Sequence, residues 1–334
     1  MWILALAACS PDDTDDDQPP PASQTSLPVT GSTPPAPDTA DTAATPPAGD
    51  LCDALPAGPY DIQSTDLVQT EEDFDFDGTG LVVLQRFNDL VGVDRDGTLS
   101  VVAVNIGLDV AGVRTLPSGD VLVTQQDLGR VSRIDRDSGG RVDVANGLGF
   151  PNGLEVGTDG WAYVSDYAEA GRVMRFDPYP SAGDAPETIL EIAYPNGLAL
   201  SPDEQTLYVA TSTNLFGGRG RVVAIDRDAS GAWSAPRSVY QADDLLDAIA
   251  VDTCGNVYVT EYTHGKVHRL HLDGTSEEIA DLRDVGFEGY CASHFSPGIG
   301  TWSPTALYVS NRHELYGIEL GVPGRHVLAA PTAR

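Results

Sequence analysis

A short β-rich segment recurs five times along this 334-residue chain and constrains its fold more than any other feature. Each copy has a β-branched or aromatic centre and ends on a polar residue. The copies are Asp120–Gln125, Trp161–Asp166, Thr206–Thr211, Asn256–Glu261 and Ala306–Asn311. The first four are followed by a Gly-Arg-Val or Gly-Lys-Val segment beginning at Gly129, Gly171, Gly220 and Gly265, at spacings of 42, 49 and 45 residues. A repeat of this length, uninterrupted by amphipathic helical stretches, is typical of a four-stranded propeller blade.

The repeat predicts an all-β fold, a six-bladed β-propeller with four antiparallel strands per blade. Phe74–Asn105 supplies a less regular first blade and His294–Leu328 the sixth. Acidic segments such as Asp94-Arg-Asp-Gly resemble calcium loops at first sight. They lack the twelve-residue spacing and the closing Glu of an EF-hand, so we interpret them as hairpin turns between the third and fourth strands of a blade.

The first fifty residues differ in composition from the rest of the chain. They hold ten of the 24 prolines and eight acidic residues, with no Lys or Arg. The apolar residues 1–8 lead into Leu6-Ala7-Ala8-Cys9, which matches a bacterial lipobox, where the cysteine is lipidated after export. We therefore predict a lipoprotein signal over residues 1–9, a disordered acidic Pro/Thr-rich tether over 10–50, and the propeller over 51–334. A frayed apolar tail on a cytosolic protein is the alternative.

The charge of the chain bears on its partners. The formal net charge is −31, of which −23 falls after residue 50. Such an acidic surface repels phosphate backbones, so we expect no nucleic-acid partner and contact with membranes only through the lipid anchor. We expect a monomer that acts on a small-molecule substrate and is anchored to the bacterial cell envelope. Ser10 after the cysteine favours the outer membrane.

The four cysteines divide between two uses. If Cys9 carries lipid, then Cys52, Cys254 and Cys291 remain, an odd number in an oxidising compartment. We expect one disulfide and one free thiol. Cys52 lies where the chain enters the propeller, and its partner is either Cys254 or Cys291.

The repeat also predicts which side chains converge on the propeller axis. We counted ten residues back from the second residue of each recurring segment, and one more where the turn is longer. This register position, at the start of the inner strand of each blade, holds Glu72, Asn152, Asn196 and Asp247 in blades one, three, four and five, Ala111 in blade two and Ser296 in blade six. Two carboxylates and two amide oxygens form a calcium-type ligand set, and a divalent cation would relieve the repulsion between the carboxylates.

The alternative is that these polar residues only begin strands. Asn152-Gly153 and Asn196-Gly197 are also common turn sequences. Four oxygen-bearing side chains in one register nevertheless favour the metal site, because unpaired buried polar groups cost about 1–3 kcal/mol each.

Residues 195–209 read Pro-Asn-Gly-Leu-Ala-Leu-Ser-Pro-Asp-Glu-Gln-Thr-Leu-Tyr-Val. This run resembles the signature of the gluconolactonase/regucalcin (senescence-marker-protein) propellers, to which serum paraoxonase is related, and the resemblance extends over all six blades. It implies a divalent metal, held by Glu72, Asn152, Asn196 and Asp247, that polarises a lactone or ester carbonyl, with Asp247 or a nearby histidine as base. The chain departs from the family at Ala248, where paraoxonases carry a second Asn ligand. In blade two, Ala111–Arg114 does not match the residues that hold the sugar lactone in gluconolactonases.

The same register predicts a pocket wall. Second strands should end at the metal end of the propeller, at Arg86, Gln125, Asp166, Thr211, Glu261 and Asn311. A polar residue at a strand end is as often simply solvated. Among the six histidines, His264 and His294 are placed at this end, so we take them with Asp247 as candidates for proton transfer.

Two functions fit these features. The first is a calcium-type metal-dependent hydrolase of a lactone or ester. The second is a non-catalytic, surface-displayed propeller that binds a ligand or partner and uses its metal structurally. A lyase is a weaker third hypothesis.

Overall fold

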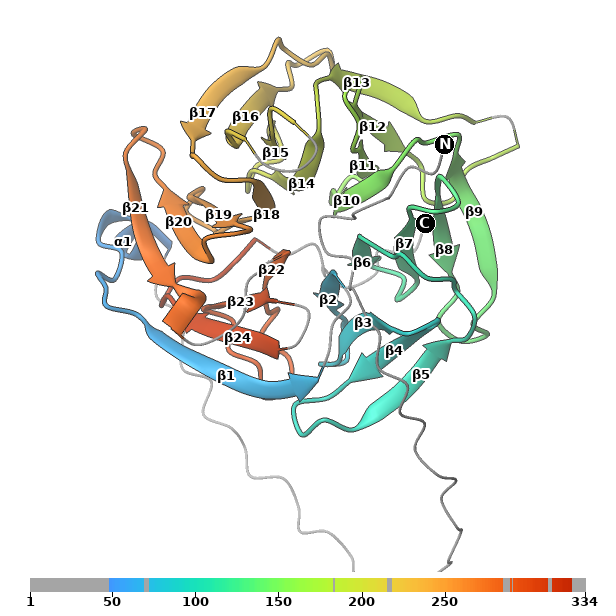
Figure 1. The fold of residues 1–334 in the computed structure, drawn as a ribbon, viewed down its shortest axis with the longest axis horizontal. Coiled ribbons are helices and arrows are strands. Elements are labelled where there is room, and N and C mark those ends of the chain that lie inside the picture. Colours follow the sequence, from blue (N-terminus) through green and yellow to red (C-terminus); the bar gives the residue numbers. More distant parts are fainter. Residues whose placement is uncertain are drawn as a thin grey trace, which may run out of the picture. The chain divides into compact units, whose positions relative to one another are not determined.

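The computed structural model describes residues 48–68, 72–182, 184–214, 218–284, 289, 291–311 and 314–325. Its strands form six four-stranded antiparallel sheets arranged around a central axis (Figure 1). The predicted six-bladed β-propeller is therefore confirmed. A short helix, α1 (Ala48–Asp53), belongs to a separate unit that precedes the propeller, and a single 3-10 turn, η1 (Leu282–Asp284), follows the fifth blade. The predicted signal and nearly all of the predicted tether lie outside the described residues.

The first five blades each use four consecutive strands, which follow one another from the inner to the outer edge of the blade. Blade one contains β2 (Phe74–Phe76), β3 (Val82–Arg86), β4 (Asp89–Val93) and β5 (Leu99–Ala103). Blade two contains β6 (Val113–Thr115), β7 (Val121–Gln125), β8 (Arg130–Ile134) and β9 (Arg141–Asn146). Blade three contains β10 (Pro151–Val156), β11 (Ala162–Asp166), β12 (Arg172–Phe176) and β13 (Glu187–Glu191). Blade four contains β14 (Pro195–Leu200), β15 (Thr206–Thr211), β16 (Arg221–Asp226) and β17 (Arg237–Gln241). Blade five contains β18 (Leu246–Val251), β19 (Val257–Glu261), β20 (Lys266–Leu270) and β21 (Ser276–Asp281).

The sixth blade closes the ring with a strand from the start of the propeller. It contains β22 (Ala292–Phe295), β23 (Ala306–Ser310), β24 (Glu314–Glu319) and, as its outer strand, β1 (Asp61–Val68). The pairing of β1 with β24 brings Ile62 opposite Ile318. The expectation that His294–Leu328 forms a complete blade is therefore wrong. Hydrogen bonds between the two ends of the chain close the propeller, which removes the free edges that an open ring would leave.

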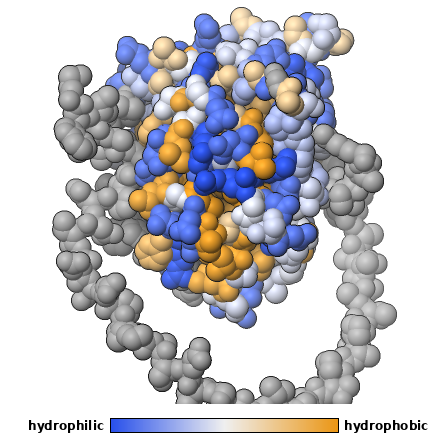
Figure 2. All heavy atoms as spheres, turned by 90° about the vertical axis from the view of Figure 1, so that its right-hand side faces the viewer, coloured by the Kyte–Doolittle hydropathy of each residue, from blue (hydrophilic) through white to orange (hydrophobic). Residues whose placement is uncertain are grey.

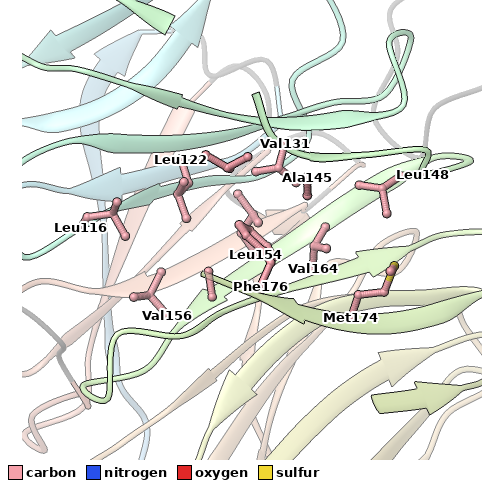
Figure 3. Close-up of a cluster of buried hydrophobic side chains, with 12 residues drawn as sticks. Leu116, Leu122, Val131, Ala145, Leu148, Leu154, Val156, Val164, Met174 and Phe176 are labelled. Atoms are coloured by element: carbon pink, nitrogen blue, oxygen red, sulfur yellow. The ribbon is translucent and has the colours of Figure 1, made fainter. Parts of the chain in front are cut away.

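Blades pack face to face, and this explains why the recurring segments can be recognised in the sequence. The second strand of a blade is covered on both faces by the neighbouring blades, and every residue of β7 and β11 is buried. Outer strands face solvent, and buried and exposed side chains do not alternate regularly along them, as in β5. Figure 3 shows one interface, where apolar side chains of blades two and three interlock around Leu122, Leu154 and Phe176. The core is therefore a series of such interfaces around the axis.

The acidic segments are hairpin turns, as predicted. Asp94 lies between β4 and β5, and Asp135 between β8 and β9. In the second turn the Asp135 carboxylate accepts a hydrogen bond from the backbone N–H of Ser138 at 2.8 Å. These carboxylates therefore satisfy turn backbone groups.

The surface of the propeller is mixed. Figure 2 shows one side, on which apolar patches surround a hydrophilic strip. Most of the exposed large hydrophobic side chains of the described residues belong to blades one and two, and they include Phe87, Val101, Val104, Leu108, Leu128 and Val142. None of the described helices has the length and apolar character needed to span a membrane.

Candidate functional site

The four predicted ligand residues occupy one register position at the axis. In each of these blades, the residue two positions after the ligand residue pairs with an equivalent residue of the second strand. These pairs are Phe74↔Leu84, Leu154↔Val164, Leu198↔Val209 and Ile249↔Val259. All four are buried, with exposed fractions of 6% for Glu72, 3% for Asn152, 1% for Asn196 and 2% for Asp247. The Nδ2 atom of Asn152 lies 3.4 Å from Oε1 of Glu72. Asn152, Asn196 and Asp247 line a cavity of about 20 Å³, in which Ala111 of blade two also lies.

The glycines that follow the ligand position show how closely the inner strands approach one another. A Cβ atom on Gly112 would lie 2.4 Å from the carbonyl oxygen of Asn152, and one on Gly153 would lie 2.5 Å from that of Asn196. On Gly197 it would lie 2.4 Å from the carbonyl oxygen of Asp247. The Asn-Gly pairs lie within strands β10 and β14, so the alternative that they form turns is wrong. Glycine is required here because neighbouring backbones meet at the axis.

Blade six departs from the expected register. Ser293 pairs with Val309, the fourth residue of the recurring segment Ala306–Asn311 as Val164 and Val259 are of theirs, so the position two residues earlier is Cys291. Ser296, the expected residue, follows the end of β22. The counting rule failed because residues 296–305 form a longer connection between β22 and β23 than the other blades have.

Two of the four ligand residues carry polar atoms that the described residues leave unpaired. Both amide atoms of Asn196 and Oδ2 of Asp247 are buried without a hydrogen-bond partner. Burial raises the pKa of Asp247 well above its ordinary value, and the Asp73 charge adds to the rise; the neighbouring Asn196 amide opposes it, although the two side chains are not in hydrogen-bonding geometry. Unpaired oxygens facing a small axial cavity are what a hard cation requires, and the set fits a calcium-type ion.

Asp73, which follows Glu72, joins two side chains beneath the ligand set. Its Oδ1 lies 2.9 Å from Nε2 of His294, and its Oδ2 lies 2.8 Å from Nη1 of Arg114. Burial raises the pKa of Asp73, but Arg114 and then His294 outweigh this effect, so the pKa lies below its usual value. Asp73 is therefore an anion that holds both side chains in place.

Arg114 and His294 separate two cavities along the axis. Both line the 20 Å³ cavity beside the ligand residues, and both line a second cavity of about 80 Å³. The second cavity is also lined by Asp75, Glu155 and Arg325. Its polar walls and size suit several ordered water molecules.

The other predicted histidine lies in a different cluster. His264 Nδ1 lies 3.2 Å from Oε2 of Glu261 and 3.4 Å from Oδ2 of Asp244. The ligand atoms of these three residues all lie within 4.8 Å of one another, so this group could also hold a cation. Nε2 of His268 lies 3.0 Å from Oε1 of Glu261. The structure therefore places His294, and not His264, beside Asp247.

The residues predicted to wall a pocket mostly bind neighbouring loops. Gln125 and Thr211 donate side-chain hydrogen bonds to the carbonyl oxygens of Ile106 and Ala193. Asp166 accepts the backbone N–H groups of Gly149 and Phe150, each at 2.8 Å. Asn311 accepts the N–H of Glu314 at 2.9 Å, and Arg86 ends β3 at a tight turn opposite Asp89. Glu261 contacts His264 and His268. None of these residues lines the axial cavity among the described residues.

Tyr167 is a site residue that the repeat did not predict. It directly follows the recurring segment Trp161–Asp166, and only 3% of its surface is exposed. Burial raises its pKa to about 12; Ser212 lowers it by a side-chain hydrogen bond, and the charges of Asp247 and Glu72 raise it further. The phenol therefore lies next to the ligand set. A signal was present, since Tyr167 occupies the same place in blade three as Gln126 in blade two.

The cysteines also differ from expectation. Cys52, Cys254 and Cys291 are each disulfide-bonded, and no cysteine among the described residues is free. The expected free thiol among them is therefore wrong. That expectation assumed that Cys9, which lies outside the described residues, is occupied by lipid.

Comparison with known proteins identifies the kind of propeller. Residues 156–283 match the family model described as SMP-30/Gluconolactonase/LRE-like region. The match covers the middle of the propeller, so over this segment the chain is similar to that family. A search of the curated proteins found no match.

Solved structures of this family have the same fold. A gluconolactonase from Xanthomonas campestris aligns with a TM-score of 0.63 at 19% identity, over 79% of this chain and 90% of its own. A luciferin-regenerating enzyme aligns with a TM-score of 0.63 at 16% identity, over 79% of this chain and 97% of its own. Regucalcin from Agrobacterium tumefaciens, described as a calcium-binding protein, aligns with a TM-score of 0.58 at 17% identity, over 80% of this chain and 95% of its own. At these identities the likeness concerns the fold.

Proposed function

We propose that this gluconolactonase/regucalcin-like propeller is a divalent-metal-dependent hydrolase of a lactone or ester. The observation that carries the proposal is the convergence of Glu72, Asn152, Asn196 and Asp247 beside His294. The unpaired polar atoms of Asn196 and Asp247 support a bound cation, as does the calcium-binding description of the regucalcin neighbour. The family match supports a lactonase-type reaction.

In this proposal the residues of the site would have different roles. Glu72, Asp247, Asn152 and Asn196 would hold a calcium-type ion by their oxygens. When bound, such an ion supplies Lewis acidity for a carbonyl and lowers the pKa of a bound water. His294 would act as general base. In the tautomer that donates from Nε2 to Asp73, its Nδ1 is unprotonated and can accept a proton. Asp73 would fix the ring and stabilise its protonated form.

A second function is favoured by the size of the axial cavity. A volume of about 20 Å³ accommodates about one water molecule and no lactone. If substrate cannot enter from the open end of the ligand set, the metal is structural and the propeller binds a ligand or partner without chemistry.

Hydrolysis assays on the full chain separate the two functions. We expect turnover of γ- or δ-lactones or aryl esters that requires added calcium, disappears with a chelator, and is lost in Asp247→Asn. Calcium-dependent stability without turnover of any such substrate would favour the non-catalytic propeller. Turnover that persists unchanged in chelator would contradict the metal-dependent mechanism.

We also propose that the protein is a monomer lipidated at Cys9 and anchored to the bacterial cell envelope, most simply the outer membrane; this requires that Cys9 forms no disulfide with Cys52, Cys254 or Cys291. The support is the sequence of residues 1–10. Cys9→Ser should move the protein from the membrane fraction to the soluble fraction. An unchanged distribution would contradict the anchor.

A further inference from the structure

The residues two positions before the ligand register take part in a repeated backbone pattern in blades two to five. In each blade, the residue two positions before the ligand position accepts a backbone hydrogen bond from the residue that follows the second strand. These bonds are Gln126 N to Asp109 O at 3.0 Å, Tyr167 N to Phe150 O at 2.9 Å, Ser212 N to Tyr194 O at 3.3 Å, and Tyr262 N to Leu245 O at 2.9 Å. We call these eight the mouth residues.

The mouth residues are largely apolar. Blades three to five contribute Phe150, Tyr167, Tyr194, Leu245 and Tyr262, together with the polar Ser212. The ring centroids of Phe150 and Tyr167 are 6.4 Å apart, and those of Tyr167 and Tyr194 are 5.5 Å apart. Three aromatic side chains thus pack in a row across blades three and four, with Phe150 and Tyr194 half-buried and Tyr167 buried. Because Phe150 and Tyr194 lie two residues before Asn152 and Asn196, these aromatic side chains border the ligand set.

Blade two supplies the polar side of the mouth. Gln126 is 4% exposed, and both atoms of its amide are buried without a hydrogen-bond partner among the described residues. An unpaired buried amide is costly and is expected where a ligand completes its hydrogen bonds. Ala111 in the same blade occupies the ligand position without contributing an oxygen. The mouth residues of blade two, Asp109 and Gln126, are therefore polar, whereas those of blades three to five are mostly aromatic or aliphatic.

This contrast bears on the substrate class. A polyhydroxylated lactone carries several hydroxyl groups, and those that lie against Phe150 and Tyr194 would lose their hydrogen bonds to water. An alkyl or aromatic substituent would gain from the same surface. Resting on the proposed hydrolase function, we infer that the site takes lactones or esters that carry an apolar substituent, with the substituent on the aromatic wall and Gln126 bound to a polar atom of the substrate.

The test is a series of δ-lactones that share one ring. δ-Gluconolactone, δ-valerolactone, δ-octanolactone and δ-decanolactone are compared as substrates of the calcium-supplemented full chain. The expected result is that kcat/KM rises with alkyl length, by up to about fourfold per buried methylene. δ-Gluconolactone should be the poorest of the four. A preference for δ-gluconolactone, or no dependence on alkyl length, would overturn the inference while leaving the hydrolase function in place.

A variant links the preference to the wall. Tyr194 has a φ of 48°, a conformation that Asn adopts readily, so Tyr194→Asn removes the ring without straining the backbone. It should flatten the dependence of kcat/KM on alkyl length. Tyr179→Asn is the matched control, because Tyr179 is 39% exposed and stacks on Arg133 away from the mouth. An equal effect of both variants would contradict the assignment of the wall.

A binding measurement distinguishes failure of the inference from failure of the proposed function. If no lactone is hydrolysed, thermal shifts with octanoate, decanoate and gluconate are compared for the parent and for Tyr194→Asn. Stabilisation that grows with alkyl length and is lost in the variant would support the apolar site and reject only the hydrolase. No alkanoate effect, or stabilisation by gluconate alone, would overturn the apolar site as well.

Discussion

Nε2 of His294 lies 2.9 Å from Oδ1 of Asp73, although the two residues are 221 positions apart in the chain. The contact joins β22 of the last blade to the residue that precedes β2 of the first. It therefore depends on ring closure, and it orients the imidazole beside the candidate ligands.

The first prediction concerns this histidine. His294→Gln should lower kcat/KM for lactone or aryl-ester hydrolysis by roughly 10²–10⁴-fold, the usual contribution of a positioned base. The calcium-dependent melting temperature should be retained, because no candidate ligand is removed. Steady-state kinetics and thermal melts on the same preparation check both points.

Two other histidines serve as comparisons. His271→Gln is the control, because His271 contacts Asn256 and Glu277 away from the axis. His264→Gln should have a much smaller effect than His294→Gln, since His264 contacts Glu261 and Asp244 and does not line the axial cavity. Equal losses in His264→Gln and His294→Gln would reject His294 as the specific base.

The second prediction concerns the cation. An ion that binds only the folded protein should raise its stability with the logarithm of free calcium, by about 2.7 kcal/mol at a hundred times the Kd. Asp247→Asn should abolish this response, because it removes a ligand charge and keeps the side-chain size. Melting temperatures across a calcium titration provide the measurement.

The structure contains a second group with metal-ligand chemistry, and this supplies the control. Glu261→Gln alters the Asp244, Glu261 and His264 cluster without touching the axis. The calcium response should survive in this variant. Loss of the response in Glu261→Gln, with retention in Asp247→Asn, would place the cation in the cluster and contradict the axial assignment.

The sequence predicted the parts of the propeller that are buried on both faces. Second strands such as β11 have every residue buried, so their composition is restricted and the repeat is visible. The ligand register followed from the same strands. The sequence analysis did not predict the closing strand Asp61–Val68, because it is an outer strand, with Asp61, Gln63 and Ser64 exposed, and it carries no copy of the recurring segment.

The repeat could not predict contacts between distant segments of the chain. It could not show that Asp73 meets His294, or that Asp166 binds the loop before β10, because both depend on how blades face each other. It also misplaced Ser296, because the connection after β22 is longer than in other blades. A repeat predicts equivalent positions, but side chains at equivalent positions can have different neighbours.

The third prediction concerns the close approach of the inner strands. Gly153→Ala should destabilise the protein by about 1–3 kcal/mol, since its Cβ would lie 2.5 Å from the backbone oxygen of Asn196. Displacement of Asn196 should also weaken the calcium response. Gly78→Ala is the control, because nothing lies within 4 Å of the added Cβ. It should be neutral or stabilise by about 0.4–1 kcal/mol. Urea unfolding of both variants is the measurement, and an unaffected Gly153→Ala would reject the packing argument.

The last prediction concerns the opposite end of the axis, where Arg325 closes the 80 Å³ cavity. Its Nη1 lies 2.8 Å from Oε1 of Glu155, its Nη2 lies 2.5 Å from Oε1 of Glu204, and its backbone N–H donates to Val251 O at 2.9 Å. Only 9% of the Arg325 side chain is exposed, and the two carboxylates are 13% and 14% exposed. One buried cation thus neutralises two acidic side chains of blades three and four.

Arg325→Met should therefore destabilise the propeller by about 3–5 kcal/mol, because it leaves two buried carboxylates without a counter-charge. Arg219→Met is the matched control, since Arg219 and Asp243 form an ion pair with side chains 75% and 87% exposed. It should cost about 0–1 kcal/mol. Adding Glu155→Gln to Arg325→Met should recover part of the loss, because it removes one of the uncompensated charges. Urea unfolding of the parent, Arg325→Met, Arg219→Met and the double variant measures these losses and the recovery. Similar losses for Arg325→Met and Arg219→Met, or no recovery in the double variant, would show that Arg325 acts by packing alone.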